Sequence, residues 1–205
     1  MAKLNELLRD LGRALEGGDL EQVASVRRTI VESHEGTKEG AEAAYKLALD
    51  ALFRQKDGDR AAELLRIAGK SKVEEWSLPA RVSLGLLLLR QGKHQQAAFE
   101  LRKVAALKPP TLMTAQAQGF LVMALYEQKN GKEAQRIRGE QLKTLFGLTQ
   151  SPEPTEAAMA HLLLGLEHKF DGQRVEAKRH LNAAVESGRL PKDELAMAQA
   201  ALAEV

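Results

Sequence analysis

Two segments of this sequence share one residue pattern, and the repetition restricts the chain to a small set of folds. In each copy an apolar stretch ends at a glycine, and a second stretch with apolar residues on one face follows. The shared positions are Leu84-Gly85, Gly92 and Leu101 in one copy and Leu164-Gly165, Gly172 and Leu181 in the other. Internal repeats of this kind predict stacked helical units rather than one irregular core.

The clearest unit spans residues 78–111. Its first half, Leu78 to Gln91, is apolar, and its second half runs from Gln95 to Lys108 before Pro109 and Pro110. Two helical stretches, a tight glycine turn and a proline stop predict an antiparallel helical hairpin. In both copies a glycine precedes a small alanine by twelve positions, Gly85 before Ala97 and Gly165 before Ala177. We expect the two helices to cross closely where both carry a small side chain.

Residues 81 to 109 resemble the tetratricopeptide repeat family. They match its pattern at Leu84, Gly85, Leu88, Ala97, Leu101 and Pro109, and a second match has Leu164, Gly165, Ala177, Leu181 and Ala184. The position that opens each motif is usually Trp, and here it is Arg81 and His161. The resemblance implies an all-α fold, a right-handed superhelical array of about five antiparallel helical hairpins.

Weaker copies of the unit fill the rest of the chain. The equivalent positions Gly12, Leu49, Gly85, Val122 and Gly165 recur at nearly even intervals, and Ser151 to Pro154 lengthens the last one. We place all six prolines at helix starts or ends, where a missing N–H does least harm. We predict a single domain over 1–205, with repeats at 4–36, 41–70, 78–111, 115–150 and 155–188 and a capping helix at 191–205.

Composition agrees with helices and excludes several classes of partner. Aromatic residues make up only 4% of the chain, while Ala and Leu, which are strong helix formers, are abundant. The net charge of +2 predicts neither nucleic acid nor an anionic membrane as a partner. There is no cysteine, so disulfides and thiolate zinc sites are excluded.

Nothing in the sequence predicts membrane insertion. Glu6, Arg9 and Asp10 interrupt any apolar signal segment, and the most apolar run, Leu84 to Leu89, is far shorter than the roughly 18 residues of a membrane span. We therefore expect a soluble cytoplasmic protein.

A search for chemistry finds no catalytic pattern. Gly69-Lys70-Ser71 resembles the end of a phosphate-binding loop, but Leu64 stands where the first glycine belongs, so a helix C-terminus is favoured. His161 and His168 share a helix face and lack a third ligand, which favours core histidines over a metal pair. His34, His94 and His180 are expected at turns or on polar faces. We expect no catalytic residue, no cofactor, no metal and no enzyme activity.

Short basic clusters occur only in second helices of the proposed hairpins. They are Arg27-Arg28, Arg102-Lys103, Arg136 with Arg138, and Lys178-Arg179. No aromatic residues are interleaved with them, so a charged solvated face is favoured over nucleic-acid binding. In the family that the chain resembles, second helices form the convex face.

The resemblance implies that the first helices line a concave surface. Lys46, Asp50 and Phe53 would face inward in the second repeat, and the Lys-Asn-Asn-Lys-Arg set with which some relatives bind a peptide carboxylate is missing. Eight apolar residues then form a predicted groove: Phe53, Leu86, Leu89, Phe120, Met123, Tyr126, Leu166 and Phe170. Exposed apolar patches usually mark interaction sites, so an amphipathic helix or apolar peptide is the expected guest. The alternative is that these residues pack on the next repeat or on the C-terminal helix.

Three functions remain open at this stage. The favoured one is an adaptor or scaffold that binds another protein or peptide in the groove. A dedicated chaperone or assembly factor for a secreted or membrane-associated client would use the same surface. A homo-oligomer built through the apolar face is the third.

Overall fold

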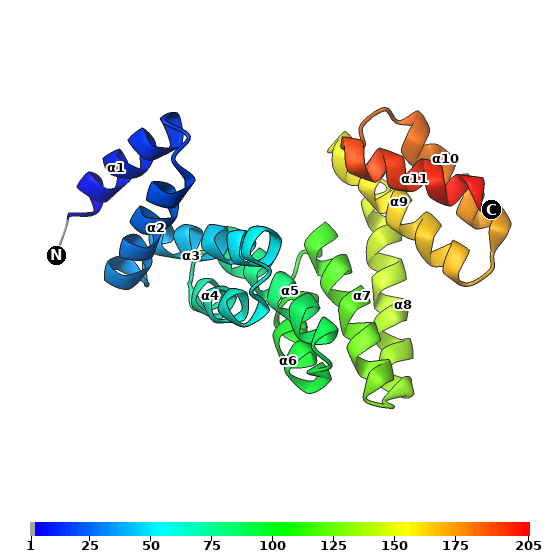
Figure 1. The fold of residues 1–205 in the computed structure, drawn as a ribbon. Coiled ribbons are helices and arrows are strands. Elements are labelled where there is room, and N and C mark those ends of the chain that lie inside the picture. Colours follow the sequence, from blue (N-terminus) through cyan, green and yellow to red (C-terminus); the bar gives the residue numbers. More distant parts are fainter. Residues whose placement is uncertain (1–2) are drawn as a thin grey trace. The chain divides into compact units, whose positions relative to one another are not determined.

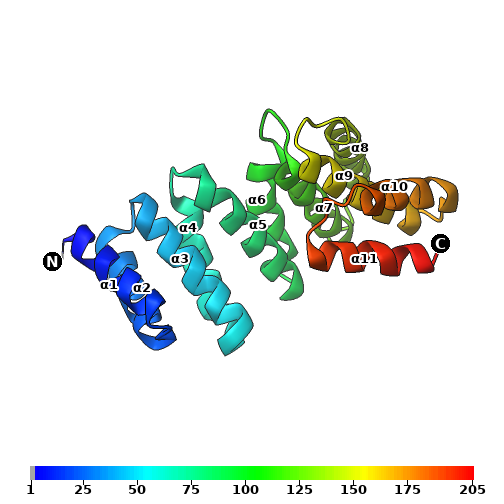
Figure 2. The same ribbon diagram turned by 90° about the horizontal axis from the view of Figure 1, so that it is seen from above.

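The computed structural model describes residues 3–205 and is helical throughout (Figures 1 and 2). The elements are α1 Leu4–Glu16, α2 Leu20–His34, α3 Lys38–Asp50, the π-helical turn η1 Ala51–Gln55, α4 Gly58–Lys70, α5 Glu74–Arg90, α6 His94–Ala105, α7 Leu112–Glu127, α8 Gly131–Leu148, α9 Pro154–Phe170, α10 Arg174–Glu186 and α11 Lys192–Ala203. No strand occurs among residues 3–205. The predicted all-α class is confirmed.

Successive helices pair into hairpins that follow the predicted repeats. Within the described chain, α1 packs on α2, α3 on α4, α7 on α8, and α9 on α10. The chain divides into two compact units, Met1–Val104 and Ala105–Val205, and the boundary falls at the end of α6. The hairpin array is confirmed, and the single domain over 1–205 stays a prediction.

Each hairpin turns through a residue in the left-handed region of backbone conformation. Gly18, Gly92 and Gly172 hold φ values of 68°, 72° and 72°, and the repeated pattern predicts the turns at Gly92 and Gly172. In the second and fourth hairpins the same conformation is held by Lys56 and Lys129. The residue after each lysine, Asp57 or Asn130, caps the following helix by accepting a backbone N–H bond.

The two motif glycines lie directly under a leucine of the facing helix. A Cβ placed on Gly85 would come within 2.5 Å of the Leu101 side chain, and one on Gly165 within 2.6 Å of Leu181. The predicted close crossing is therefore real, but a leucine fills the space above each glycine, whereas the sequence predicted a small alanine. Ala97 and Ala177 are buried nearby on the same second helices.

One proline lies inside a helix, contrary to expectation. Helix α5 begins at Glu74, four residues before the predicted start of the third repeat, so Pro79 falls in its interior. Glu74 and Glu75 favour a helix start because acidic side chains stabilise the positive end of the helix dipole. The helix therefore extends back across the proline at the loss of one backbone hydrogen bond.

The C-terminal helix covers the last hairpin, as predicted. In Figure 1, α11 lies against α9 and α10. Its Ala198 and Ala201 are buried in one cluster with Leu162, Leu181 and Ala184. Helix α11 thus covers an apolar face of the last hairpin that would otherwise be exposed to solvent.

We predict that Gly165→Ala destabilises the protein by about 1–3 kcal/mol, because the new methyl group overlaps the Leu181 side chain and approaches its backbone N. Gly139→Ala is the matched control, since this exposed residue of α8 has nothing within 4 Å of its Cβ position. That change is expected to stabilise by about 0.5–1 kcal/mol through helix propensity. Urea unfolding measures both values, and a neutral or stabilising Gly165→Ala would contradict the packing.

Candidate functional site

A pocket of about 450 Å³ opens between α2, α3 and α5 in the first unit. We call it the Trp76 pocket. Its lining includes all three residues of the second repeat that were predicted to face inward, Lys46, Asp50 and Phe53. The full lining is Arg27, Tyr45, Lys46, Leu49, Asp50, Phe53, Arg54 and Trp76.

A π-helical turn forms one edge of this pocket. Helix α3 continues into η1, which carries Phe53 and Arg54, and the left-handed residue Lys56 follows it. The Asp50 carboxylate accepts a hydrogen bond from Arg54 Nη1 at 2.7 Å and another from Gln55 Nε2 at 2.8 Å. The phenyl ring of Phe53 is left 76% exposed. Single π turns are rare and occur frequently at functional sites.

Two further aromatic rings, those of Tyr45 and Trp76, line the pocket. The ring centroids of Tyr45 and Trp76 are 5.9 Å apart, and Lys46 Nζ lies 5.8 Å from the centroid of the Trp76 ring. The indole N–H of Trp76 is buried and has no acceptor among the described residues. The pocket therefore combines apolar ring surface with a cation at its rim.

Arg27 also lines this pocket, although the sequence predicts it on a solvated face. It was assigned with Arg28 to a charged face of second helices, but its side chain meets first-helix residues at the pocket. Burial lowers the pKa of Arg27, and the negative charges of Glu42 and Asp50 oppose that shift. Among the described residues the Arg27 guanidinium makes no ion pair or hydrogen bond. A partly desolvated cation without a paired anion favours binding of one.

The other predicted groove residues of the first unit are less open. Leu86 and Leu89 are half-buried on α5, one on each side of the buried pair Leu87 and Leu88 in the sequence. Val82, another inward position of the same helix, is buried. Phe53 is thus the large apolar groove residue of this unit that solvent reaches most freely.

In the second unit, three predicted groove residues are exposed and two are not. Met123 and Tyr126 of α7 are 54% and 48% exposed. Phe170 at the end of α9 is 86% exposed, with the Arg138 guanidinium 6.0 Å from its ring centroid. Phe120 is half-buried, and Leu166 packs on the core cluster that α11 completes. Because this cluster contains residues of α9, α10 and α11, the packing alternative is favoured for Leu166.

Polar pairs replace the usual tryptophan corner of the motif in two hairpins. Arg81 donates to Glu100 at 2.5 Å between α5 and α6. At the matching positions of the last hairpin, His161 Nδ1 and His180 Nδ1 lie 2.9 Å apart between α9 and α10. A side-chain bond between the two helices thus occupies the corner that a large ring fills in the family pattern.

The last hairpin gathers three histidines. His168 stacks on His180 with ring centroids 5.5 Å apart, and His180 is buried, not on a polar face as predicted. Burial and the adjacent Arg179 lower the pKa of His180 to about 4, and the same two causes lower that of His161. The expectation that His161 and His168 belong to the hairpin interior agrees with their half-buried positions.

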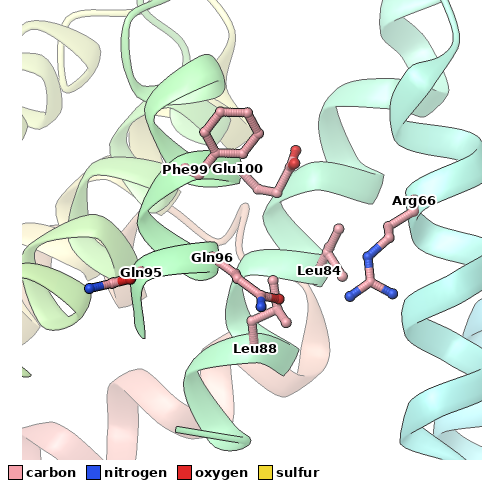
Figure 3. Close-up of a pocket in the computed structure, with 7 residues that line it drawn as sticks. All are labelled: Arg66, Leu84, Leu88, Gln95, Gln96, Phe99 and Glu100. Atoms are coloured by element: carbon pink, nitrogen blue, oxygen red, sulfur yellow. The ribbon is translucent and has the colours of Figure 1, made fainter. Parts of the chain in front are cut away.

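A smaller hollow of about 270 Å³ lies beside α4, α5 and α6 (Figure 3). Figure 3 shows Arg66 extending from α4 toward Leu84, with Phe99 and Glu100 on α6 and Gln95 pointing away. Glu100 is already engaged by Arg81 and Lys103, and Lys103 Nζ lies 3.9 Å from the centroid of the exposed Phe99 ring. Glu100 is therefore already paired, whereas Arg66 makes no ion pair or hydrogen bond among the described residues.

The remaining sequence motifs are structural. Gly69-Lys70-Ser71 ends α4, so the helix C-terminus is confirmed. The other basic clusters lie on second helices, and Arg136, Arg138 and Arg179 pair with carboxylates. Across residues 3–205 no three His, Asp or Glu side chains are grouped so that they could hold a metal ion. None of the described helices has the length and apolar character needed to cross a membrane.

Comparison with known proteins supports the fold. No protein-family model matches the chain, and no curated protein matches it. Among solved structures, the crystal structure of MamA, a TPR-like protein, is similar with a TM-score of 0.50 and 17% sequence identity. The match covers 87% of this chain and 94% of that chain. The fold is therefore TPR-like.

We predict that acid destabilises the protein between the ordinary histidine pKa of 6.5 and the His180 value of about 4. In that interval the unfolded chain binds a proton that folded His180 does not, so stability falls as pH falls. The melting temperature of the wild type should drop by several degrees from pH 7 to pH 4.5. His180→Gln should lower the melting temperature at pH 7 but shrink this acid-induced drop. An unchanged drop in the variant would show that His180 does not titrate in this way.

Proposed function

We propose that this chain is a protein-interaction module, an adaptor or scaffold, that binds a peptide or an amphipathic helix through side chains of its first helices. The observation that carries the proposal is the exposure of large apolar residues at predicted groove positions. Phe53, Met123, Tyr126 and Phe170 are each between 48% and 86% exposed. The TPR-like fold supports this class of function but does not specify it, because one architecture hosts many functions.

These residues are suited to act as anchors for a partner. Burying a side chain such as Phe or Met stabilises a complex by about 1.5–3 kcal/mol. Aromatic side chains and Met are enriched at interfaces, and a few such residues usually dominate the binding energy. The exposed residues are held on helices, so little backbone conformational entropy is lost when a partner binds.

We propose a non-catalytic role. The Trp76 pocket has no histidine, serine or threonine in its lining, and its one carboxylate, Asp50, is held by Arg54 and Gln55. A chaperone or assembly factor would use the same exposed side chains on an unfolded client. A homo-oligomer would bury them against a second copy.

We predict that Phe53→Glu and, separately, Met123→Glu combined with Tyr126→Glu each reduce partner recovery by about tenfold or more, because a charge replaces an apolar anchor. The measurement is a pull-down from source-cell lysate with quantitative mass spectrometry. Circular dichroism should stay unchanged, because all three side chains are largely exposed.

The matched controls are Phe99→Glu and Phe146→Glu, whose rings are 60% and 61% exposed on second helices. These controls should retain the partner. Loss of partner with the controls alone would place the binding surface on the second helices. A wild-type dimer in light scattering that Phe53→Glu dissociates would support the homo-oligomer.

A further inference from the structure

The charges of the Trp76 pocket do not balance. Three cations, Arg27, Lys46 and Arg54, line it together with the single carboxylate of Asp50. Arg54 is paired with Asp50 at 2.7 Å, so these two charges compensate each other. Lys46 Nζ lies 3.5 Å from Glu42 Oε1. Both side chains are exposed, so this ion pair contributes little to stability. Arg27 is left without an anionic partner among the described residues.

The unbalanced cation lies beside apolar ring surface. Tyr45, Trp76 and the exposed Phe53 line the same pocket as Arg27, and Leu49 lies between Tyr45 and Phe53 on the helix. A ligand that fits both features carries an anion next to an aromatic or branched apolar side chain. A monoanion fits better than a phosphate, because a dianion would also meet the carboxylates of Asp50 and Glu42.

We propose that the Trp76 pocket binds a segment of a partner protein in which an Asp or Glu side chain stands next to an aromatic or Leu side chain. The carboxylate pairs with Arg27 and is attracted by Lys46, and the apolar neighbour packs on Phe53 and Leu49. This proposal rests on the proposed function and names the chemistry that the first unit selects. Arg27 accounts for selectivity, because a planar guanidinium binds a carboxylate through two parallel hydrogen bonds.

The structure also supplies an optical probe for the test. Trp76 is the one tryptophan of the chain, so its fluorescence reports on this pocket alone when the ligand has no tryptophan. Arg28 provides the matched control, because it is the exposed neighbour of Arg27 and does not line the Trp76 pocket.

The experiment selects ligands from a random 12-residue peptide library without tryptophan, displayed on phage, against the full chain. We expect enriched peptides to share an acidic residue beside an aromatic residue or Leu. A synthetic copy of the most enriched peptide, blocked at both ends, is then titrated while Trp76 fluorescence is recorded. Glu→Gln or Asp→Asn in the peptide, and Arg27→Gln in the protein, should each weaken binding by about tenfold. The two changes together should weaken it little further, because they remove the same contact.

Several outcomes would overturn the proposal. One is an enriched set without acidic residues, and another is equal binding by wild type and Arg27→Gln. A response to inorganic phosphate at the same concentrations as the peptide would assign the site to a free anion. If Arg27→Gln melts at a lower temperature than Arg28→Gln, the variants Lys46→Gln and Phe53→Ala, at the pocket surface, are tested in its place. Each of them should weaken binding of the peptide. Peptides that bind without changing Trp76 fluorescence would refute this site but leave the proposed function standing. If no selection yields a peptide and the pull-downs recover no partner, both the site and the proposed function are refuted.

Discussion

The contact of a glycine with a leucine across each well-matched hairpin is the constraint on which the rest of the structure depends. Gly85 lies under Leu101, and Gly165 lies under Leu181, at distances that leave no room for a Cβ atom. This contact sets how closely the two helices of the hairpin approach. Both leucines are fully buried, so the same contact anchors the local core.

The close approach of the two helices also brings polar side chains at neighbouring positions into contact. It brings Arg81 against Glu100 in one hairpin and His161 against His180 in the other. Polar pairs at such positions hold the two helices through directed bonds, whereas the large ring of the family pattern would hold them through contact area. The histidine pair is therefore sensitive to pH, because two imidazole rings can share a hydrogen bond only while at least one of them is neutral.

The sequence predicted the parts of the fold that follow from local spacing. Leu84, Gly85, Leu101 and the turn glycines follow from spacing that repeats. The π-helical turn η1 does not, because no local rule requires it, and the start of α5 at Glu74 was not predicted because Pro79 was expected at a helix start. Of the predicted groove residues, Phe53, Met123, Tyr126 and Phe170 are exposed, and the groove itself stays a prediction. Leu166 instead packs on a cluster built from α9, α10 and α11, and such a tertiary contact leaves no signal in the local sequence.

Residues of the candidate site were missed for the same reason. Arg27 sits in a second helix beside Arg28, and only the packing of α2 on α3 turns one of the two toward the Trp76 pocket. His180 has no sequence signal apart from its spacing from His161, which repeats that of Glu100 from Arg81. For Trp76 the sequence offers one indication of function. It is the one tryptophan in a chain poor in aromatic residues, and tryptophan is enriched at interfaces.

We propose that first-helix side chains contact a partner protein, and crosslinking in the source cells probes this contact in place. A photoreactive phenylalanine analogue is placed at Phe53 or, in a separate strain, at Phe99, which is similarly exposed but on a second helix. We expect a discrete crosslinked product with another protein from position 53 and none from position 99. Crosslinks from position 99 alone, or none from either position, would contradict it.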